Sequence, residues 1–274
     1  MGTNKMRFDH FLITRFNLKK KDWLEDKNRQ NVLDEDWLNH RIDLFSSYCL
    51  PSVLGQKEKE FKWLIFFERD SPTPVNNLIK KLNSYPFIEP IFLSGYEEFQ
   101  SDLPSIVQSR LNCDSEYVVT TRLDNDDALH KDFIKYLHDS FELKNNFLID
   151  FPSGLFLELE GMIKLGHTFS PYNQFISLVE SLEDHEIITV FGKEHDKWGE
   201  DYEIKSVKLN YAWLQITHSR NKINFFKGRM VPSTKLNGFN LKNKPVGVKH
   251  DVILLVKRIG QLVKKLKTIN KNIS

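Results

Sequence analysis

The sequence lacks the features that mark several large classes of protein. Its two cysteines, Cys49 and Cys113, are too few for a disulfide framework and lack the spacing of a metal site, so we expect both to be reduced and buried. No apolar run approaches the roughly 20 residues that span a bilayer. Residues 1–6 lack the apolar stretch of a signal peptide, and Met6 stands where a myristoylation motif needs Ser or Thr. We therefore expect a cytoplasmic protein.

The chain also has little excess charge of either sign. Its 39 basic and 37 acidic residues leave a formal net charge of +2, which gives no overall field to attract nucleic acid, so no nucleic-acid partner is expected. Hydrophobic residues make up 40% of the 274 residues and charged residues 28%, as in ordinary globular proteins of a size that buries a proper core.

The first half of the chain alternates two kinds of apolar pattern. Continuous apolar runs predict strands, and apolar residues at helical spacing predict helices. An alternation of this kind is typical of an α/β fold in which helices flank a mixed, mainly parallel, Rossmann-like sheet. The predicted strands are Phe8–Arg15, Phe61–Phe67, Ile88–Leu93 and Tyr117–Leu123, and the predicted helices are Trp37–Tyr48, Val75–Leu82, Phe99–Leu111 and 129–141.

The pattern changes near Asn145. Phe147–Leu165 predicts two or three short strands joined by hairpin turns, Phe175–Glu183 a short helix, and Gly192–Tyr202 a loop rich in Gly, His and acids. We divide the chain into residues 1–145, a nucleotide-sugar-binding half, and residues 146–245, an acceptor-binding and catalytic half of the same domain. We expect residues 246–274 to form a C-terminal amphipathic helix.

Three carboxylates end the fourth predicted strand: Asp124, Asp126 and Asp127. Ligands lie at the carboxyl ends of strands in such sheets. Carboxylates at this place suit Mg²⁺ or Mn²⁺, which takes its remaining ligands from phosphate oxygens and water. An EF-hand is excluded because Leu129 and Lys135 stand where it needs Gly and Glu. Ala128 argues against an aspartyl phosphatase. The alternative is helix capping, with Asp127 as the N-cap residue.

Other polar residues could complete this site. His218 follows an apolar run and is either a third metal ligand or a hydrogen-bonded structural residue. Arg15 follows the first strand, and Arg122 lies two residues before Asp124 and therefore on the same face of its strand. Their guanidinium groups could neutralise a diphosphate, or form surface salt bridges.

Trp198-Gly-Glu-Asp-Tyr202 places two carboxylates after a glycine. We predict Asp201 as the general base that takes the proton of an acceptor hydroxyl and Glu200 as an acceptor contact, with Glu180 and Asp196 in reserve. An ordinary acidic helix start is the alternative.

The segment Asp251–Lys267 interleaves apolar and basic residues at helical spacing. One interpretation packs the apolar face on the domain and leaves a solvated basic rim. The other lays the helix on an anionic membrane surface, which would suit a lipid-linked acceptor and a peripheral place at the inner face of the cell membrane.

Five segments resemble the bacterial rhamnosyltransferase family and, more remotely, the inverting glycosyltransferases that share the GT-A fold. They are Phe11-Leu-Ile-Thr-Arg-Phe-Asn17, Leu50-Pro-Ser-Val-Leu-Gly-Gln56, Phe61-Lys-Trp-Leu-Ile-Phe-Phe67, Thr121-Arg-Leu-Asp-Asn-Asp-Asp127 and Trp213-Leu-Gln-Ile-Thr-His218. The resemblance extends to about Asn221 and leaves out the C-terminal tail.

The resemblance implies a nucleotide-sugar donor, dTDP- or UDP-linked, a divalent cation, and inversion at the anomeric carbon. It assigns Thr14, Arg15 and Asp70 to the nucleotide and Asp124 and Asp126 to the metal and diphosphate. Glu68-Arg-Asp70 departs from the paired aspartates usual in the larger group, which affects the base and ribose contacts.

We thus expect a metal-dependent glycosyltransferase that acts on a saccharide or lipid-linked saccharide in surface polysaccharide synthesis, with rhamnose as one candidate sugar. The alternatives are a metal-dependent phosphohydrolase or nucleotidyltransferase that uses the same aspartates, and a non-catalytic carbohydrate-binding protein with a degenerate transferase fold.

Overall fold

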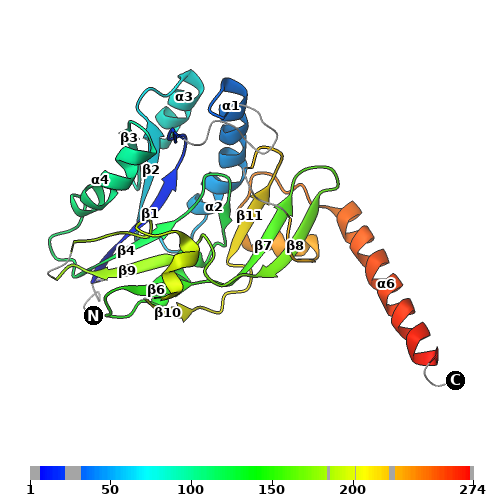
Figure 1. Ribbon diagram of the computed structural model, residues 1–274. Helices are drawn as coiled ribbons and strands as arrows, with labels where there is room; N and C mark the ends of the chain where they lie inside the picture. The colour runs from blue at the N-terminus through cyan, green and yellow to red at the C-terminus, as the bar shows by residue number, and fades with distance from the viewer. Residues whose placement is uncertain (1–6, 22–31, 184–185, 201, 222–225, 272–274) are drawn as a thin grey trace.

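A seven-stranded mixed sheet forms the centre of the molecule (Figure 1). The computed structural model describes residues 7–21, 32–183, 186–200, 202–221 and 226–271. The strand order is β10-β6-β9-β4-β1-β2-β3, and only β9 runs antiparallel to its neighbours. The strands are β1 (Phe8–Arg15), β2 (Lys62–Glu68), β3 (Ile88–Leu93), β4 (Tyr117–Arg122), β6 (Phe147–Asp150), β9 (Ser177–Ser181) and β10 (Glu203–Ser206).

Helices cover both faces of this sheet, because the apolar side chains of β1 point alternately to one face and the other and both sets are buried. Leu12 packs in one apolar cluster with residues of α1, α3 and α5, whereas Phe11 and Ile13 point to the opposite face and pack with residues of α4. The helices are α1 (Glu35–Leu44), continued by the π-helical turn η1 (Phe45–Cys49) and by α2 (Leu50–Leu54), then α3 (Thr73–Leu82), α4 (Tyr96–Gln108) and α5 (Phe133–Asp139). The predicted mainly parallel α/β class is confirmed.

A second sheet of five strands lies beside the first, in the order β12-β8-β7-β11-β5. It consists of β5 (Ala128–Leu129), β7 (Ser153–Glu158), β8 (Lys164–Phe169), β11 (Trp213–Thr217) and β12 (Arg229–Met230). The indole of Trp213 lies so close to Gly154 that a Cβ there would be 2.1 Å from it, so position 154 requires glycine. Because β5 begins one residue after Asp127, the acidic loop connects the two sheets.

The remaining described elements are the short 3₁₀ segments η2 (His195–Glu200) and η3 (Ser233–Gly238) and the long helix α6 (Val248–Lys271). Figure 1 shows α6 extending away from the second sheet. None of the described helices combines the length and the apolar composition that crossing a bilayer requires.

Three sequence predictions about local structure are wrong. Residues 177–181 form the buried strand β9 rather than a helix, because pairing with β4 and β6 outweighs the local pattern. The helix predicted over 129–141 is shorter, because Leu129 pairs with Trp213 in the second sheet. Cys113 is exposed, whereas Cys49 is buried as predicted.

Candidate active site

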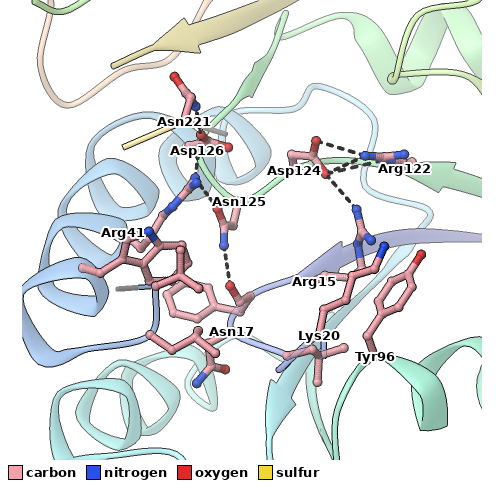
Figure 2. Close-up of a pocket in the computed structure, with 15 residues that line it drawn as sticks. Arg15, Asn17, Lys20, Arg41, Tyr96, Arg122, Asp124, Asn125, Asp126 and Asn221 are labelled. Carbon is pink, nitrogen blue, oxygen red and sulfur yellow. Dashed lines mark hydrogen bonds and ion pairs between the residues drawn. The ribbon is translucent and has the colours of Figure 1, made fainter. Parts of the chain in front are cut away.

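A cavity of about 280 Å³ opens at the carboxyl ends of β1 and β4, beside α1 (Figure 2). Parallel neighbouring strands bring these ends together: Ile13 of β1 pairs with Arg122 of β4. The chain beyond each strand therefore turns into the same cavity. Its polar lining comprises Arg15, Asn17, Lys20, Arg41, Tyr96, Arg122, Asp124, Asn125, Asp126 and Asn221, and its apolar lining Phe16, Leu18, Val32, Leu33 and Trp37.

Asp124 lies between two arginines. It forms two ion pairs. Arg122 Nη2 lies 3.2 Å from Asp124 Oδ2, and Arg15 Nη2 lies 3.7 Å from Asp124 Oδ1. Burial alone would raise the pKa of Asp124, but the charges of Arg122 and Arg15 outweigh burial and lower it. The predicted partnership of Arg122 with Asp124 is thus present.

Aromatic rings hold the two arginines in place. The Arg15 guanidinium lies 5.2 Å from the ring centre of Tyr96 and 5.1 Å from that of Phe191, and the Arg122 guanidinium lies 5.5 Å from the Phe191 ring. Two cations thus share one carboxylate, and this end of the cavity keeps a surplus positive charge that suits a phosphate group.

Asp126 has a different environment. Its Oδ2 accepts hydrogen bonds from Arg41 Nη1 at 2.6 Å and Asn221 Nδ2 at 3.2 Å, and lies 3.1 Å from His218 Nε2. The side chains of Asp126 and Arg41 are each 7% exposed. Burial alone would raise the pKa of Asp126, but Arg41 and His218 outweigh burial and hold it well below its usual value.

Asp127 points away from the cavity and ties the loop to the second sheet. Its Oδ1 accepts the backbone N–H of Ile216 at 2.8 Å, and its Oδ2 accepts Gln174 Nε2 at 3.1 Å. Burial, and then the charges of Asp126 and Asp124, raise the pKa of Asp127 well above its usual value. The capping alternative is wrong, because α5 begins only at Phe133.

Asp126 and His218 could hold a divalent cation. Ligands about 2.1 Å from an octahedral ion lie about 3 Å apart at adjacent positions, close to the observed 3.1 Å between Oδ2 and Nε2. His218 is only 1% exposed, and its Nδ1 lies 3.2 Å from His40 Nε2, a contact that orients the ring. In the described part of the chain, no three His, Cys, Asp or Glu side chains gather around one point. A cation here would draw its other ligands from phosphate and water.

Arg41 is a site residue that the sequence analysis missed. It lies on α1, and besides Asp126 it donates to Asn125 Oδ1 at 3.2 Å and lies over the Trp37 ring. Its buried Nε has no hydrogen-bond partner among the described residues. A signal was present in the sequence: position 41 falls on the apolar face of the helix, four residues after Trp37, where a charged residue needs a partner.

Thr14 and Asp70, the other predicted nucleotide contacts, are not among the cavity-lining residues. Thr14 is fully buried, and its Oγ1 accepts Trp63 Nε1 at 2.9 Å. Asp70 is exposed in the turn after β2. In this region Asn17 reaches the cavity, and its amide also binds Ser71 Oγ at 3.1 Å and the Glu68 backbone N–H at 3.1 Å.

The predicted catalytic pair lies largely outside the part of the chain that can be described. Asp201 is outside the described residues, and only the backbone of Glu200 and Asp196 is described, within η2. Glu180 pairs with Val118, toward the end of β4 remote from Asp124. Both its carboxylate oxygens accept backbone N–H groups, from Ile188 at 2.7 Å and Thr189 at 3.0 Å, which indicates a structural role.

The fold and the cavity together define an α/β protein with an arginine-lined cavity at the carboxyl edge of its main sheet. The sequence profile of the family described as "Putative rhamnosyl transferase" matches residues 5–229. The chain belongs to this family of glycosyltransferases. No curated protein sequence matches it.

Solved structures that resemble the chain are distant. S. aureus TarS (residues 1–349) shares 12% identity with a TM-score of 0.31, over 56% of this chain and 37% of that one. A T. maritima inositol-1-phosphate CTP transferase shares 12% identity with a TM-score of 0.38, over 77% of this chain and 90% of that one. The chain thus spans little more than a third of that TarS structure.

Proposed function

We propose that the protein transfers a sugar from a nucleotide-sugar donor to a saccharide acceptor, with inversion at the anomeric carbon. The observation that carries the proposal is the acidic loop of a rhamnosyltransferase-family chain, which lies at a cavity lined by three arginines. Rhamnose linked to dTDP is the first donor to test and a UDP-sugar the second. The acceptor is a saccharide, free or lipid-linked, of the kind used in surface polysaccharides.

The donor's diphosphate lies against Arg15 and Arg122 in this proposal. Their surplus charge at Asp124 is available for phosphate oxygens, and the flanking rings of Tyr96 and Phe191 limit the movement of both guanidinium groups. Asp126 and His218 would hold Mg²⁺ or Mn²⁺. When bound, such an ion offsets the negative charge that develops on the departing nucleoside diphosphate.

Arg41 keeps Asp126 ionised and in place. It donates to the oxygen that faces His218, so a cation at that oxygen would compete with the guanidinium. Arg41 also lines the cavity, where its guanidinium would be available to a phosphate oxygen of the donor. In this way Arg41 both prepares the carboxylate and contributes to diphosphate binding.

The chemical step is a displacement at the anomeric carbon. The acceptor hydroxyl oxygen forms a bond to that carbon as the bond to the diphosphate oxygen breaks, and the hydroxyl proton passes to a carboxylate. In this proposal that carboxylate is Asp201, predicted from the sequence, with Glu200 in contact with the acceptor. The products are a glycoside and a nucleoside diphosphate.

Thermal unfolding with nucleotides tests the donor site. A ligand that binds only the folded protein raises the unfolding temperature. We expect dTDP or UDP to do so in the presence of Mn²⁺, and less in EDTA. The matched sugar nucleotide should then release its nucleoside diphosphate faster with acceptor present.

Product analysis, together with the nucleotide effect on unfolding, separates the alternatives. Phosphate release without glycoside would indicate a phosphohydrolase, and pyrophosphate exchange a nucleotidyltransferase. No nucleotide effect with or without Mn²⁺ would indicate a non-catalytic carbohydrate-binding protein, and each of these outcomes contradicts the proposal.

A further inference from the structure

The long C-terminal helix α6 carries an apolar stripe that is exposed in the described part of the protein. At about 100° per residue, the stripe is roughly 120° wide. Its exposed fractions range from 44% at Val263 to 80% at Val248. The stripe consists of Val248, Val252, Leu255, Val256, Ile259, Leu262 and Val263.

The first turns of α6 fix the direction in which this stripe faces. His250 Nε2 donates to the Val231 carbonyl at 2.8 Å, and Leu254 is only 6% exposed. Asp251 accepts both the backbone N–H and the hydroxyl of Ser233, at 2.8 and 2.5 Å. His250 and Leu254 lie on the side of the helix roughly opposite the stripe. The contacts with the domain therefore turn the apolar stripe outward, and Figure 1 shows most of α6 clear of the domain.

The charge on α6 indicates what covers the stripe. Asp251 is the last acidic residue of the chain and is already bonded to Ser233. Beyond it lie six basic residues and no acidic ones: Lys257, Arg258, Lys264, Lys265, Lys267 and Lys271. In the helical projection Lys257, Arg258 and Lys264 lie outside the apolar stripe. An outward apolar stripe on a helix segment that carries basic and no acidic residues matches a surface that is apolar beneath and anionic at its face, as a membrane with acidic lipids is.

A second copy of the chain matches less well. Val252, Leu255, Ile259 and Leu262 have the alternating spacing of a coiled-coil seam. Pairing two such helices, however, would bring twelve like charges together with no acidic residue beyond Asp251 to compensate them. A neutral apolar partner would match the stripe but would offer no negative charge to the basic residues.

We infer that α6 is a membrane-docking helix that lays its apolar stripe into the interface of an anionic bilayer. The docking keeps the protein at a lipid surface without crossing it. A lipid-linked acceptor would then be presented to the active site at high local concentration. This benefit rests on the proposed function, whereas the membrane docking itself does not depend on it.

Vesicle co-sedimentation of the full chain tests the inference without donor or acceptor. We expect binding to phosphatidylcholine vesicles that contain phosphatidylglycerol, at least ~10-fold weaker binding to phosphatidylcholine alone, and a decrease as salt rises. A failure of glycosyl transfer would leave this result untouched, and a failure of vesicle binding would leave the proposed transfer untouched.

Three variants separate the stripe from the charge. Leu255→Gln with Ile259→Gln and Leu262→Gln keeps good helix formers but replaces three of the seven apolar residues of the stripe, and should reduce binding at least ~10-fold. Lys257→Gln with Lys264→Gln should weaken binding to anionic vesicles only. Gln261→Ala, outside the stripe, is the matched control and should bind normally, and circular dichroism verifies that all three stay helical.

Absence of wild-type binding to anionic vesicles would overturn the inference, as would equal binding to neutral ones. Light scattering adds a further check. A lipid-free dimer that the triple variant converts to a monomer would assign the stripe to a second copy of the chain and contradict membrane docking.

Discussion

Asp124 and Asp126 lie two residues apart and have opposite kinds of environment. The Asp124 side chain is 31% exposed and shares its charge with two arginines held by aromatic rings, whereas the Asp126 side chain is 7% exposed and enclosed by Arg41, His218 and Asn221. The first arrangement leaves positive charge facing the cavity. The second places a carboxylate beside an imidazole. In the proposed function, the first environment would bind the diphosphate of the donor and the second would hold the cation.

The largest expected effect follows from removing the charge of Asp126. Asp126→Asn keeps the shape but removes the carboxylate, so transfer should fall at least ~10²-fold, with loss of the Mn²⁺ effect on nucleotide binding. Steady-state rates over a range of Mn²⁺ concentrations measure this. Near-normal transfer in a folded variant would contradict the role of Asp126 at the metal.

Breaking the buried pair from the other side should affect stability first. Arg41→Met leaves the Asp126 carboxylate buried without its main cation, which should lower the unfolding free energy by about 3 kcal/mol. Urea unfolding gives the value. The double variant Arg41→Met with Asp126→Asn should recover part of the loss, and strictly additive losses would show that the two residues are not coupled.

At the Asp124 end the expected change is in donor affinity. Arg122→Gln or Arg15→Gln removes one charge-assisted contact, so nucleoside diphosphate binding should weaken about 10-fold with little change in unfolding temperature. Calorimetry measures the affinity. Arg69→Gln, an exposed arginine paired with Glu98, is the matched control and should bind as the wild type does.

The smallest effect on activity and stability is expected at Asp127. Its role is tested by the pH dependence of the unfolding free energy rather than by ligand binding. The pKa of Asp127 is raised in the folded protein, so the folded state binds its proton at higher pH than the unfolded state does. Asp127 therefore contributes stability that grows as the pH falls through this raised pKa toward 3.8. For Asp124 and Asp126 the pKa is lowered, and their contribution is instead lost in acid.

Asp127→Asn should change the unfolding free energy at neutral pH by no more than about 1 kcal/mol and keep transfer activity. As the pH is lowered from neutral toward 4, the wild type should gain stability relative to this variant. A difference in unfolding free energy that does not vary with pH would show that Asp127 is ionised in the folded protein.

Local pattern was sufficient to predict the first half of the main sheet and the position of the acidic loop. Each strand there is a short segment rich in apolar residues and bounded by charged or turn residues, and the loop follows the fourth of them. The helix predicted over residues 175–183 was wrong because long-range strand pairing, and not the local pattern, determines the structure of β9. Residues 177–181 form a buried strand because β4 and β6, distant in sequence, pair with its two edges.

The candidate site was predicted where it depends on strand ends and missed where it depends on packing. Arg122 could be paired with Asp124 because alternation along a strand places them on one face. Arg41 could not be placed, because its approach to Asp126 depends on how α1 packs beside β4. The sequence left His218 as either a metal ligand or a structural residue, and the structure places its imidazole beside Asp126.

The strand β11 sets the tolerance of this site to insertions and deletions. The Ile216 backbone holds Asp127, and two residues further on the His218 side chain reaches Asp126. Alternate residues of a strand share a face, so one added or lost residue between them would turn the imidazole to the far side of the sheet. Length variation among relatives should therefore be absent between positions 216 and 218, and tolerated in the surface turns that connect the strands.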